Sequence, residues 1–580
     1  MEQRNLIVAI VLSVAILLGF QFFYEMPRME KQRALQAQLQ KQEQVVTPPA
    51  PGQPGAQPGT TQPAVGQAPA GAAPVAAAAV PEAPRVKIVS PRVNGSISLA
   101  GGRIDDVVLT DYRETTEPRS PNIHLLSPSG TANPYFAEFG WVAGANGVTL
   151  PGPDTRWQAS GIELTPAKPV VLTWDNGQGL KFEREYKIDR DFMITVSDRV
   201  TNSGQQTTTL FPYALISRAG TPQIQGFYIL HEGLIGVLKG TLKELTYKDI
   251  AEKAKIEEES TGGWVGITDK YWLVALAPDG QAKIKARFAH SIANRADKYQ
   301  VDVLGEGVAV EPGKTSQSTI RLFAGAKQAR LLDNYATDLK IERFDLAIDF
   351  GWFYFLTKPI FYLLDYFTSF FGNVGLAILG LTVLIKLLMF PLANKSYRAM
   401  NRMKALQPEM LRIREQYGDD RQRMNQSMME LYKKEKVNPA AGCLPIVVQI
   451  PVFFALYKVL FVTIEMRHAP FYGWIKDLSA PDPTTIFNLF GLIPWQPPEL
   501  LIIGVWPLIM GATMWVQQKL NPQPADPIQA KVFMFLPIMF TVMLASFPAG
   551  LVIYWAWNNL LSILQQWVLM RSAPADKPKT

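Results

Sequence analysis

The fold is decided by one apolar run, which reads Val374-Gly-Leu-Ala-Ile-Leu-Gly-Leu-Thr-Val-Leu-Ile-Lys-Leu-Leu-Met-Phe-Pro-Leu392. A helix of this length can cross the hydrocarbon core of a bilayer. Lys386 interrupts the run, and a lysine near the middle of a spanning helix costs roughly 2.5 to 3.5 kcal/mol on insertion scales. The ammonium group therefore needs a polar or hydrated surrounding. The alternative is that its long side chain snorkels to the interface, because the run ends six residues later.

Five further runs have the length of a membrane span, and 48% of the 580 residues are hydrophobic while only 18% are charged. The runs cover residues 6–24, 444–464, 500–516, 532–547 and 551–570. The first resembles a signal peptide in position but lacks a small-residue cleavage site, which indicates an uncleaved anchor at residues 1–24. The runs at 500–516 and 532–547 are short, and short spans thin the bilayer around them. The sequence predicts a polytopic α-helical membrane protein with six spans.

Orientation follows from the placement of Lys and Arg. Residues 394–438 lie between two spans and carry eleven basic side chains against six acidic ones, which places this segment in the cytoplasm. Both termini then lie in the cytoplasm, and residues 25–350 lie on the outer side. The net charge of +7 is modest and gathered into a few segments, so it indicates topology rather than DNA binding.

The outer part divides by composition into three pieces. Residues 25–84 form a charged segment and a Pro/Ala-rich tether that is too poor in large apolar side chains to fold. Residues 85–340 contain short segments rich in β-branched and aromatic residues between turn clusters, which predicts a large all-β sandwich domain. Residues 341–372 mix aromatics with charges and are broken by Pro359, which favours an amphipathic helix in the outer interface. The alternative for this last piece is a seventh span.

The cytoplasmic segment has the pattern of a helical hairpin. Apolar residues recur at spacings of three and four on both sides of Gly418-Asp419-Asp420, and Pro408 should kink the first helix. Methionines are frequent in the seam, namely Met403, Met410, Met424 and Met428. Thioethers suit surfaces that bind varied apolar partners, but they can equally fill a two-helix seam.

Polar side chains recur inside three of the predicted spans. In the last span Tyr554, Asn558, Ser562 and Gln566 follow one another at steps of four, which places them on one face of a helix. Thr382 lies one turn from Lys386, and Gln449 lies in the span at 444–464. No Asp or Glu lies in any span, so this set predicts a hydrated cavity around an unneutralised cation. Lys458, in the outer half of the third span, is expected to snorkel outward.

Several classes of chemistry lack their residues. The chain has one cysteine, Cys443, and its four histidines all lie outside the spans, so we expect no disulfide, no intramembrane metal site and no Ser-His pair. No P-loop motif is present and no cofactor is expected. Ion-coupled transporters usually carry midplane carboxylates, which counts against transport. A polytopic transporter, a membrane scaffold and an outer-domain enzyme using His231 and Glu232 remain as alternatives.

Several motifs together resemble the YidC family of bacterial membrane protein insertases. They are Lys386 to Pro391, Gly418-Asp419-Asp420, Glu435-Lys-Val-Asn-Pro-Ala-Ala-Gly-Cys-Leu-Pro-Ile-Val-Val-Gln-Ile-Pro451, Leu478-Ser-Ala-Pro-Asp-Pro483 and Phe547-Pro-Ala-Gly-Leu-Val-Ile-Tyr-Trp555. The resemblance is close over residues 340–570. It implies a five-span insertase core at residues 373–571 around a hydrophilic groove, a periplasmic β-domain, and residence in the cell inner membrane. It also implies a chaperone role in protein transport and no enzymatic reaction.

The resemblance also implies residues and partners. The substrate groove would be formed by Lys386, Thr382, Gln449, Tyr554, Trp555, Asn558 and Ser562, and the four methionines named above would contact substrate or partner in the cytoplasm. Partners would be nascent membrane proteins, the Sec translocon (SecYEG and SecDF), the ribosome and the phospholipid bilayer. Two positions depart from the family: Lys386 replaces a common Arg, and Trp555 stands where some relatives have Tyr. The tail at 572–580 has only two lysines, a weak signal for ribosome contact.

Overall fold

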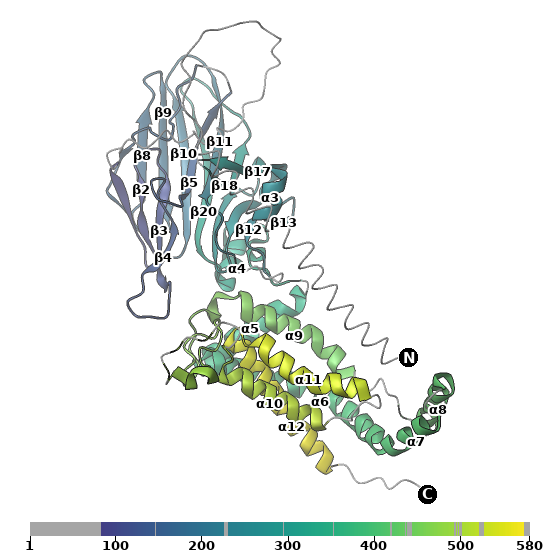
Figure 1. Cartoon of the computed structure of the whole chain (residues 1–580). Helices are drawn as coiled ribbons and strands as arrows, with labels where there is room; N and C mark the ends of the chain where they lie inside the picture. Colours follow the sequence, from purple (N-terminus) through teal and green to yellow (C-terminus); the bar gives the residue numbers. More distant parts are fainter. Residues whose placement is uncertain are drawn as a thin grey trace, which may run out of the picture. The chain divides into compact units, whose positions relative to one another are not determined.

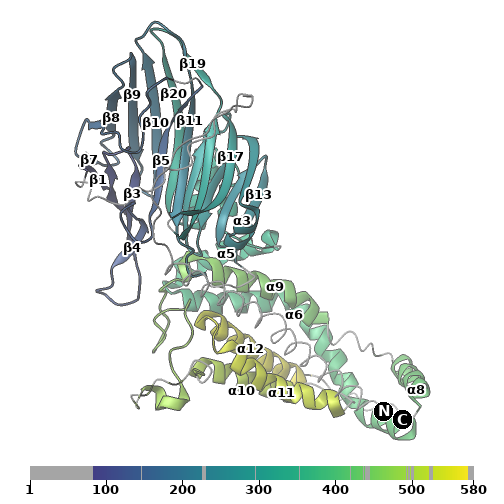
Figure 2. The ribbon, with the colours of Figure 1, turned by 45° about the horizontal axis from the view of Figure 1, so that its top comes forward.

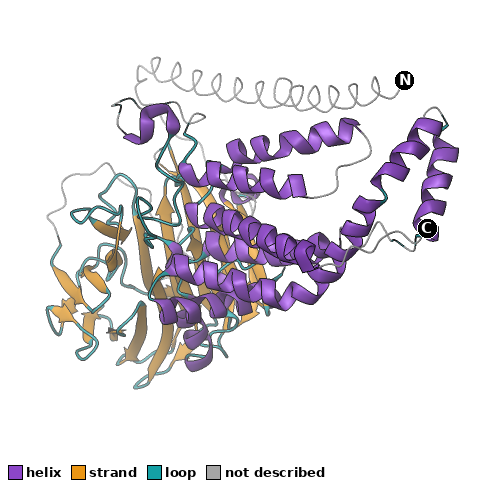
Figure 3. Ribbon diagram, turned by 90° about the horizontal axis from the view of Figure 1, so that it is seen from below, coloured by secondary structure: helices purple, strands orange, loops and turns teal. Residues whose placement is uncertain are grey.

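The computed structural model of the chain describes residues 83–572, apart from gaps at 145–146, 225–229, 294, 352, 418–419, 436, 438–443, 492, 494, 496, 498–501 and 521–526. The predicted anchor, nearly all of the tether, Cys443 and the tail after residue 572 lie outside the described residues. Strands occupy the N-terminal part of the described chain and helices the C-terminal part (Figure 3).

The β-domain consists of two large, mostly antiparallel sheets (Figure 1). In spatial order, the path through the first sheet is β14 (Lys255–Thr261), β17 (Lys283–Ala293), β18 (Ala296–Gly305), β11 (Thr208–Ala219), β5 (Tyr135–Ala143), β3 (Ile104–Arg113), β2 (Val93–Ser98), β1 (Arg85–Val89) and β7 (Glu163–Leu164), with β19 (Val308–Val310) on β11 and β4 (Asn122–Leu126) on β3. The second contains β13 (Thr241–Thr246), β12 (Gly233–Leu238), β15 (Trp264–Thr268), β16 (Trp272–Pro278), β20 (Thr315–Ala326), β10 (Met193–Asn202), β9 (Leu180–Ile188), β8 (Val170–Asp175) and β6 (Gln158–Ala159). A short helix, α3 (Tyr247–Lys253), joins β13 to β14.

The strands form where the sequence alternates between apolar and polar residues. In β9, Phe182, Tyr186 and Ile188 are buried while Lys181 and Lys187 on the other face are exposed, as expected for a sheet with one face against the core. The antiparallel register pairs Tyr186 with Val196 of β10, so apolar side chains of neighbouring strands meet on the same face. The predicted β-sandwich is confirmed.

A buried arginine forms an ion pair within one sheet and a hydrogen bond to the other sheet inside the sandwich. Arg184 on β9 is 1% exposed and contacts its register partner Asp198 on β10 through Nε at 2.5 Å and Nη2 at 3.1 Å. Its Nη2 also donates to Phe139 O on β5 of the other sheet, at 2.7 Å. The guanidinium fork therefore satisfies a buried carboxylate and a carbonyl at once, which is what makes a charge tolerable in a core.

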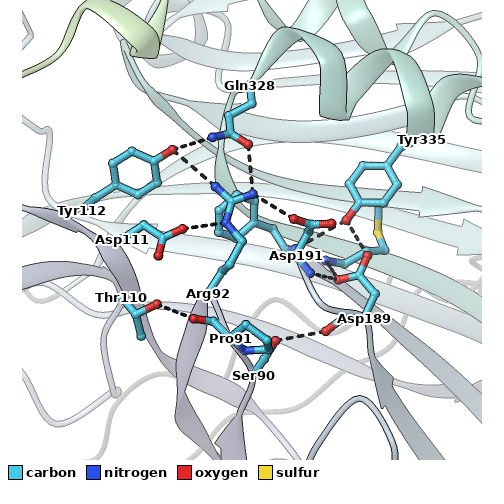
Figure 4. Close-up of polar contacts among 12 residues, drawn as sticks. Ser90, Pro91, Arg92, Thr110, Asp111, Tyr112, Asp189, Asp191, Gln328 and Tyr335 are labelled. Atoms are coloured by element: carbon cyan, nitrogen blue, oxygen red, sulfur yellow. Dashed lines mark hydrogen bonds and ion pairs between the residues drawn. The ribbon is translucent and has the colours of Figure 1, made fainter. Parts of the chain in front are cut away.

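A second polar cluster ties the sandwich to helix α4 (Ala329–Asp338) (Figure 4). Arg92 contacts Asp111 at 2.7 Å and Asp191 at 2.8 Å, and its Nη1 donates to the Oε1 of Gln328, the N-cap residue of α4, at 3.0 Å. Tyr335 on α4 donates to Asp189 at 2.5 Å. One arginine thus connects β3, the loop between β9 and β10 and the start of α4, and it holds α4 against the sandwich.

The chain then passes through a 3-10 turn, η2 (Phe344–Ala347), into α5 (Tyr354–Phe371). Lys358 on α5 fixes this junction, because its Nζ donates to Asp333 of α4 and Asp345 of η2, both at 2.8 Å. Burial by itself lowers the pKa of Lys358, but the hydrogen bonds to Asp333 and Asp345 outweigh it and the net shift is upward. The prediction that Pro359 breaks this segment is wrong: α5 continues through it. The tertiary bonds of Lys358 and the burial of Phe361 offset the one backbone hydrogen bond that proline lacks.

The helical part packs α6 (Val374–Ala405), α9 (Leu444–Val462), α10 (Val505–Leu520), α11 (Pro527–Leu544) and α12 (Ala549–Ser572) against one another and α5. Helix α6 runs on past α9 and α12 toward α7 (Gln407–Tyr417) and α8 (Arg421–Lys434) (Figure 2). Among the described residues, α6 is the one helix whose length and composition alone suffice to cross a membrane, and 449–462 and 530–544 are shorter apolar helices.

Two boundaries differ from the sequence prediction. Helix α10 begins at Val505 rather than near residue 500, because Asp482 and Thr484 from the preceding loop accept the first backbone N–H groups of the helix. The hairpin predicted at residues 394–438 does not begin at residue 394. Instead α6 extends to Ala405, and the helix restarts at Gln407 with Pro408 in its first turn, where proline is tolerated.

Candidate functional site

Four polar side chains from three helices form one hydrogen-bonded group, the groove cluster: Lys386 on α6, Gln449 on α9, and Asn558 and Ser562 on α12. Lys386 Nζ donates to Ser562 Oγ at 2.7 Å, and Ser562 Oγ donates to Asn558 O at 2.8 Å. Gln449 Nε2 donates to Asn558 Oδ1 at 3.1 Å. The spacing of four on α12 puts Asn558 and Ser562 on one face, and this face meets both α6 and α9.

Lys386 is half-buried, and its hydrogen bond goes to a neutral hydroxyl. Within the described residues no carboxylate forms an ion pair with it. A half-buried ammonium without a counter-charge retains its attraction for an incoming anion, since no internal carboxylate cancels it. The groove cluster can therefore bind a polar or acidic group transiently.

The other three groove residues proposed from the resemblance lie close to the groove cluster but play different structural parts. Thr382 is buried, and its hydroxyl donates to Ile378 O of its own helix at 2.6 Å. Tyr554 is buried and hydrogen-bonded to Gln449. Trp555 stacks on Phe453 of α9 with ring centroids 5.0 Å apart and planes 6° apart.

An aromatic stack lies beside the groove cluster. Phe453 is sandwiched between Trp555 and Tyr457, and Tyr457 contacts Phe547 at a centroid distance of 6.1 Å. Phe547 directly precedes α12, so the stack lies toward the start of α12 and the end of α9. It separates the groove cluster from the chain segments that join these helix ends.

Further polar residues lie on the other side of the groove cluster, and two of them, Tyr397 and Asn394, were not predicted from the sequence. Tyr397 on α6 is hydrogen-bonded to Ser562 and Gln566. Asn394 Oδ1 and Gln565 Nε2 are buried atoms that have no hydrogen-bond partner among the described residues. Tyr397 lies eleven residues after Lys386, close to three full turns, so the helical period could have revealed it. Buried polar atoms of this kind are usually satisfied by water.

The four methionines lie on three helices. Met403 lies near the end of α6, Met410 lies on α7, and Met424 and Met428 lie on α8, all half-buried. Tyr432 Oη contacts Met410 Sδ at 3.8 Å across the α7–α8 pair. Asp420 caps α8 by accepting from the Arg423 N–H at 3.1 Å, which fixes the turn between the two helices. Met429, next to Met428 on α8, is 53% exposed.

Lys458 on α9 does not join the groove cluster. Its Nζ contacts Asp349 Oδ2 at 2.6 Å, in the loop before α5, and its stem lies against Gly351, where an added Cβ would come within 2.9 Å of Lys458 Cε. Gly351 has φ +74°, a conformation that favours glycine, and its N–H donates to Asp349 Oδ1 at 2.9 Å. This arrangement fastens α9 to the segment that leads into α5.

We expect Asp349→Ala to destabilise the helical part by about 1 to 3 kcal/mol, because it leaves the ammonium of Lys458 partly buried without this carboxylate. Asp349→Ala combined with Lys458→Met should cost less than the sum of the two single changes. Thermal unfolding of the detergent-solubilised protein measures both. Strict additivity of the two changes would show that the pair is not coupled.

The alternative that the β-domain is an enzyme relied on His231 and Glu232, and the structure shows no hydrogen bond between these two side chains. His231 Nε2 is hydrogen-bonded to Leu234 O at 3.0 Å, and burial lowers the pKa of this histidine. Glu232 Oε1 accepts the Lys270 backbone N–H at 3.1 Å. Both side chains serve the local loop structure. No group of three His, Cys, Asp or Glu residues suited to a metal ion occurs in the part of the chain that the structure describes.

Comparison with known proteins agrees with the two-part architecture. Residues 85–363 match the family model described as the YidC periplasmic domain, and residues 366–576 match that described as the 60Kd inner membrane protein. The chain belongs to the YidC family of membrane protein insertases. The membrane protein insertase YidC of Bradyrhizobium diazoefficiens is 55% identical over 98% of this chain and 96% of its own length. That of Brucella suis is 49% identical over 98% and 96%.

A solved structure titled as an active YidC insertase with its first transmembrane domain resolved covers 84% of this chain and 92% of its own, with 15% identity and a TM-score of 0.34. A TM-score of this size does not support a comparison of positions. Membership in the YidC family rests on the sequence matches, and it makes nascent membrane proteins the substrates and the inner membrane the site of action.

Proposed function

We propose that this insertase receives the polar flank of a nascent membrane segment in a hydrated groove built on the groove cluster, while the apolar part of the segment moves into lipid. The observation that carries the proposal is the hydrogen bond of Lys386 to Ser562, in a cluster without a carboxylate among the described residues. Lys386 attracts acidic or polar groups of the substrate and binds them transiently. It forms no covalent bond with the substrate.

Hydrophobic transfer supplies the driving force. Each Leu, Ile, Phe or Val that enters the bilayer contributes roughly 0.3 to 0.6 kcal/mol, so about 15 of them contribute approximately 5 to 9 kcal/mol. One acidic residue at the bilayer centre costs roughly 2.5 to 3.5 kcal/mol without help. At an effective dielectric constant near 20, a cation about 4 Å away offsets as much as roughly 4 kcal/mol of this cost. A short acidic flank can therefore cross without an energy-coupling site.

The proposed topology has six spans with both termini in the cytoplasm and the β-domain in the periplasm. The unsatisfied buried atoms of Asn394 and Gln565 support a groove that is hydrated toward the α7–α8 side, and the aromatic stack at Trp555 supports closure toward the opposite side. Helices α10 and α11, at about 24 and 27 Å, are shorter than the roughly 30 Å hydrocarbon core, which favours local thinning of the bilayer beside the groove.

Partner contacts follow from the same topology. The half-buried methionines of α7 and α8, together with exposed Met429, would meet the hydrophobic segment on the cytoplasmic side. Helix α5, with its exposed Phe355, Tyr366 and Phe370, would lie in the outer interface. Cooperation with the Sec translocon and docking of the ribosome are part of this proposal.

Reconstitution tests the proposed function. Proteoliposomes that contain only this protein should insert a single-span substrate with a short acidic outer flank, measured by protection of the flank from added protease. Empty liposomes and liposomes with an unrelated polytopic protein provide the background. Insertion no greater than this background would contradict the proposal, and uptake of a soluble solute without insertion would indicate a transporter.

Removal of the β-domain should leave insertion largely intact, because none of the groove cluster residues comes from it. Deletion of residues 85–300 keeps α4, α5 and the helical part. We expect the deleted protein to retain at least half of the insertion activity per molecule in proteoliposomes. A loss of activity at equal protein level would show that the β-domain takes part in insertion.

A further inference from the structure

The loop between α9 and α10 carries an exposed apolar surface that the groove does not use. This surface, the loop patch, consists of six exposed side chains: Ile486, Phe487, Leu489, Phe490, Ile493 and Trp495. Leu489 and Phe490 are 52% and 55% exposed. Residues 484–496 contain no Asp, Glu, Lys or Arg. Several large apolar side chains gathered on one loop mark an interaction surface, whereas single exposed ones do not.

The backbone of the loop patch binds largely to itself. It begins with the 3-10 segment η5 (Ile486–Gly491), in which Leu489 and Phe490 have φ values of +49° and +59°. The Phe490 N–H donates to Thr485 O at 2.9 Å, and the Ile493 N–H donates to Asn488 O at 3.1 Å. Left-handed conformations are unfavourable for Leu and Phe, so the surroundings must hold them. Internally satisfied N–H groups are what a peptide segment needs when it faces lipid.

Hydrogen bonds connect the residues directly before the loop patch to the start of α10. Asp482 is buried, and it accepts from the Trp474 indole N–H at 3.0 Å and from the Trp506 backbone N–H at 2.9 Å. Thr484 Oγ1 accepts the Val505 N–H at 3.0 Å. A Cβ on Gly504 would lie 2.5 Å from Asp482 Cγ, so only glycine allows this close approach. These bonds fix residues 482–484, directly before the loop patch, to the start of α10.

We propose that the loop patch inserts into the boundary between headgroups and acyl chains of the outer leaflet. Its composition of Trp, Phe, Leu and Ile without charge matches a lipid surface and offers a protein partner no charged group for specific recognition. Helix α10 also exposes apolar side chains, among them Trp515 and Val516. This inference rests on the topology proposed above, in which α9 and α10 are spans joined on the outer side.

Fluorescence quenching in vesicles tests this placement. A thiol-reactive, environment-sensitive dye is attached at Leu489→Cys in a Cys443→Ser protein, reconstituted in phosphatidylcholine and phosphatidylglycerol with and without nitroxide-bearing lipids. Leu388→Cys, 74% exposed on α6, serves as the lipid-facing control, and Ile292→Cys, 73% exposed on β17, as the aqueous control. We expect at least twofold quenching at Leu489 and Leu388, and none at Ile292.

The outcomes separate the placement from the topology. Quenching at Leu388 but not at Leu489 would overturn the lipid assignment and leave the topology standing. No quenching at either position would overturn both. If the dye at Leu489 is not quenched by nitroxide-bearing lipids and its emission changes only when purified translocon is added, the loop patch binds protein. This result also overturns the lipid assignment.

A second variant isolates the apolar side chains from the backbone. Leu489→Asn combined with Phe490→Asn keeps residues that tolerate positive φ and removes most of the apolar surface. Lipid quenching of a dye at Ile493→Cys should fall at least twofold in this background. Ile292→Asn is the matched control and should leave it unchanged. Unchanged quenching in the double variant would contradict insertion through these two residues.

Discussion

Lys386→Glu should reduce insertion of a substrate with an acidic outer flank about tenfold, while Lys386→Arg should retain nearly full activity. The glutamate places a like charge in the path of the flank, and a tenfold change corresponds to about 1.4 kcal/mol, well within the range of a charge interaction at roughly 4 Å. Arg preserves the positive charge. Protease protection of the flank, in cells depleted of the native protein or in proteoliposomes, measures the effect.

A matched pair of single-span substrates, one with an acidic flank and one with a neutral flank, provides the control. Lys386→Ala should lower insertion of the acidic substrate several-fold and leave the neutral one nearly unchanged. The same variant should not lower the stability of the protein, because it removes a half-buried cation that donates to a neutral hydroxyl and forms no ion pair with a carboxylate of the described residues. Equal effects on both substrates, or no effect on either, would contradict the electrostatic role of Lys386.

Arg184→Ala should destabilise the β-domain by about 3 to 5 kcal/mol, the largest stability effect expected from a single change in this chain. The variant leaves Asp198 buried without its partner and removes a donor from Phe139 O in the opposite sheet. For a domain of this size the change corresponds to a fall of about 10 °C in Tm. Pulse proteolysis of the full-length protein in urea measures the unfolding of the β-domain.

The surface pair Lys283–Glu306 supplies the control for Arg184. Both side chains are mostly exposed at a distance of 3.2 Å, and Lys283→Ala should change stability by less than about 0.5 kcal/mol. Arg184→Met combined with Asp198→Leu should recover much of the lost stability, since an apolar pair replaces a buried ion pair at little cost. If Arg184→Ala were as mild as Lys283→Ala, the buried pair would not stabilise the sandwich.

The β-domain could be predicted because its signal is local. Alternation with a period of two is written directly in segments such as residues 181–188, and the structure pairs them as β9 with its neighbours. Helix boundaries were less predictable, because they depend on distant residues. The start of α10 is set by Asp482 and Thr484, more than twenty residues earlier, and α5 continues through Pro359 while Lys358 is fixed by Asp333 and Asp345.

The sequence could predict which residues belong to the groove cluster, but it could not predict which of them form hydrogen bonds with one another. Steps of four on one helix and an isolated cation on another pointed to Asn558, Ser562 and Lys386. The partner of Lys386 lies 176 residues away, and no sequence pattern specifies that contact. Lys458 was expected to snorkel outward rather than to join the cavity, and it lies outside the groove cluster. Its partner Asp349, 109 residues before it, could be found only from the structure. Thr382 was predicted to line the groove, but its hydroxyl donates to Ile378 O of its own helix and not to another residue of the groove cluster.

The proposed mechanism requires that a hydrated groove around Lys386 opens to the cytoplasm and is closed to the outside. One-sided labelling tests it most directly, with single cysteines at Gln449, Asn558 or Ser562 in a Cys443→Ser protein and a membrane-impermeant thiol reagent. We expect reaction at these positions from the cytoplasmic side of inverted vesicles and no reaction from the outer side of spheroplasts. Equal labelling from both sides would indicate a channel and contradict the claim, and no labelling from either side would show dry interhelical packing and contradict it as well.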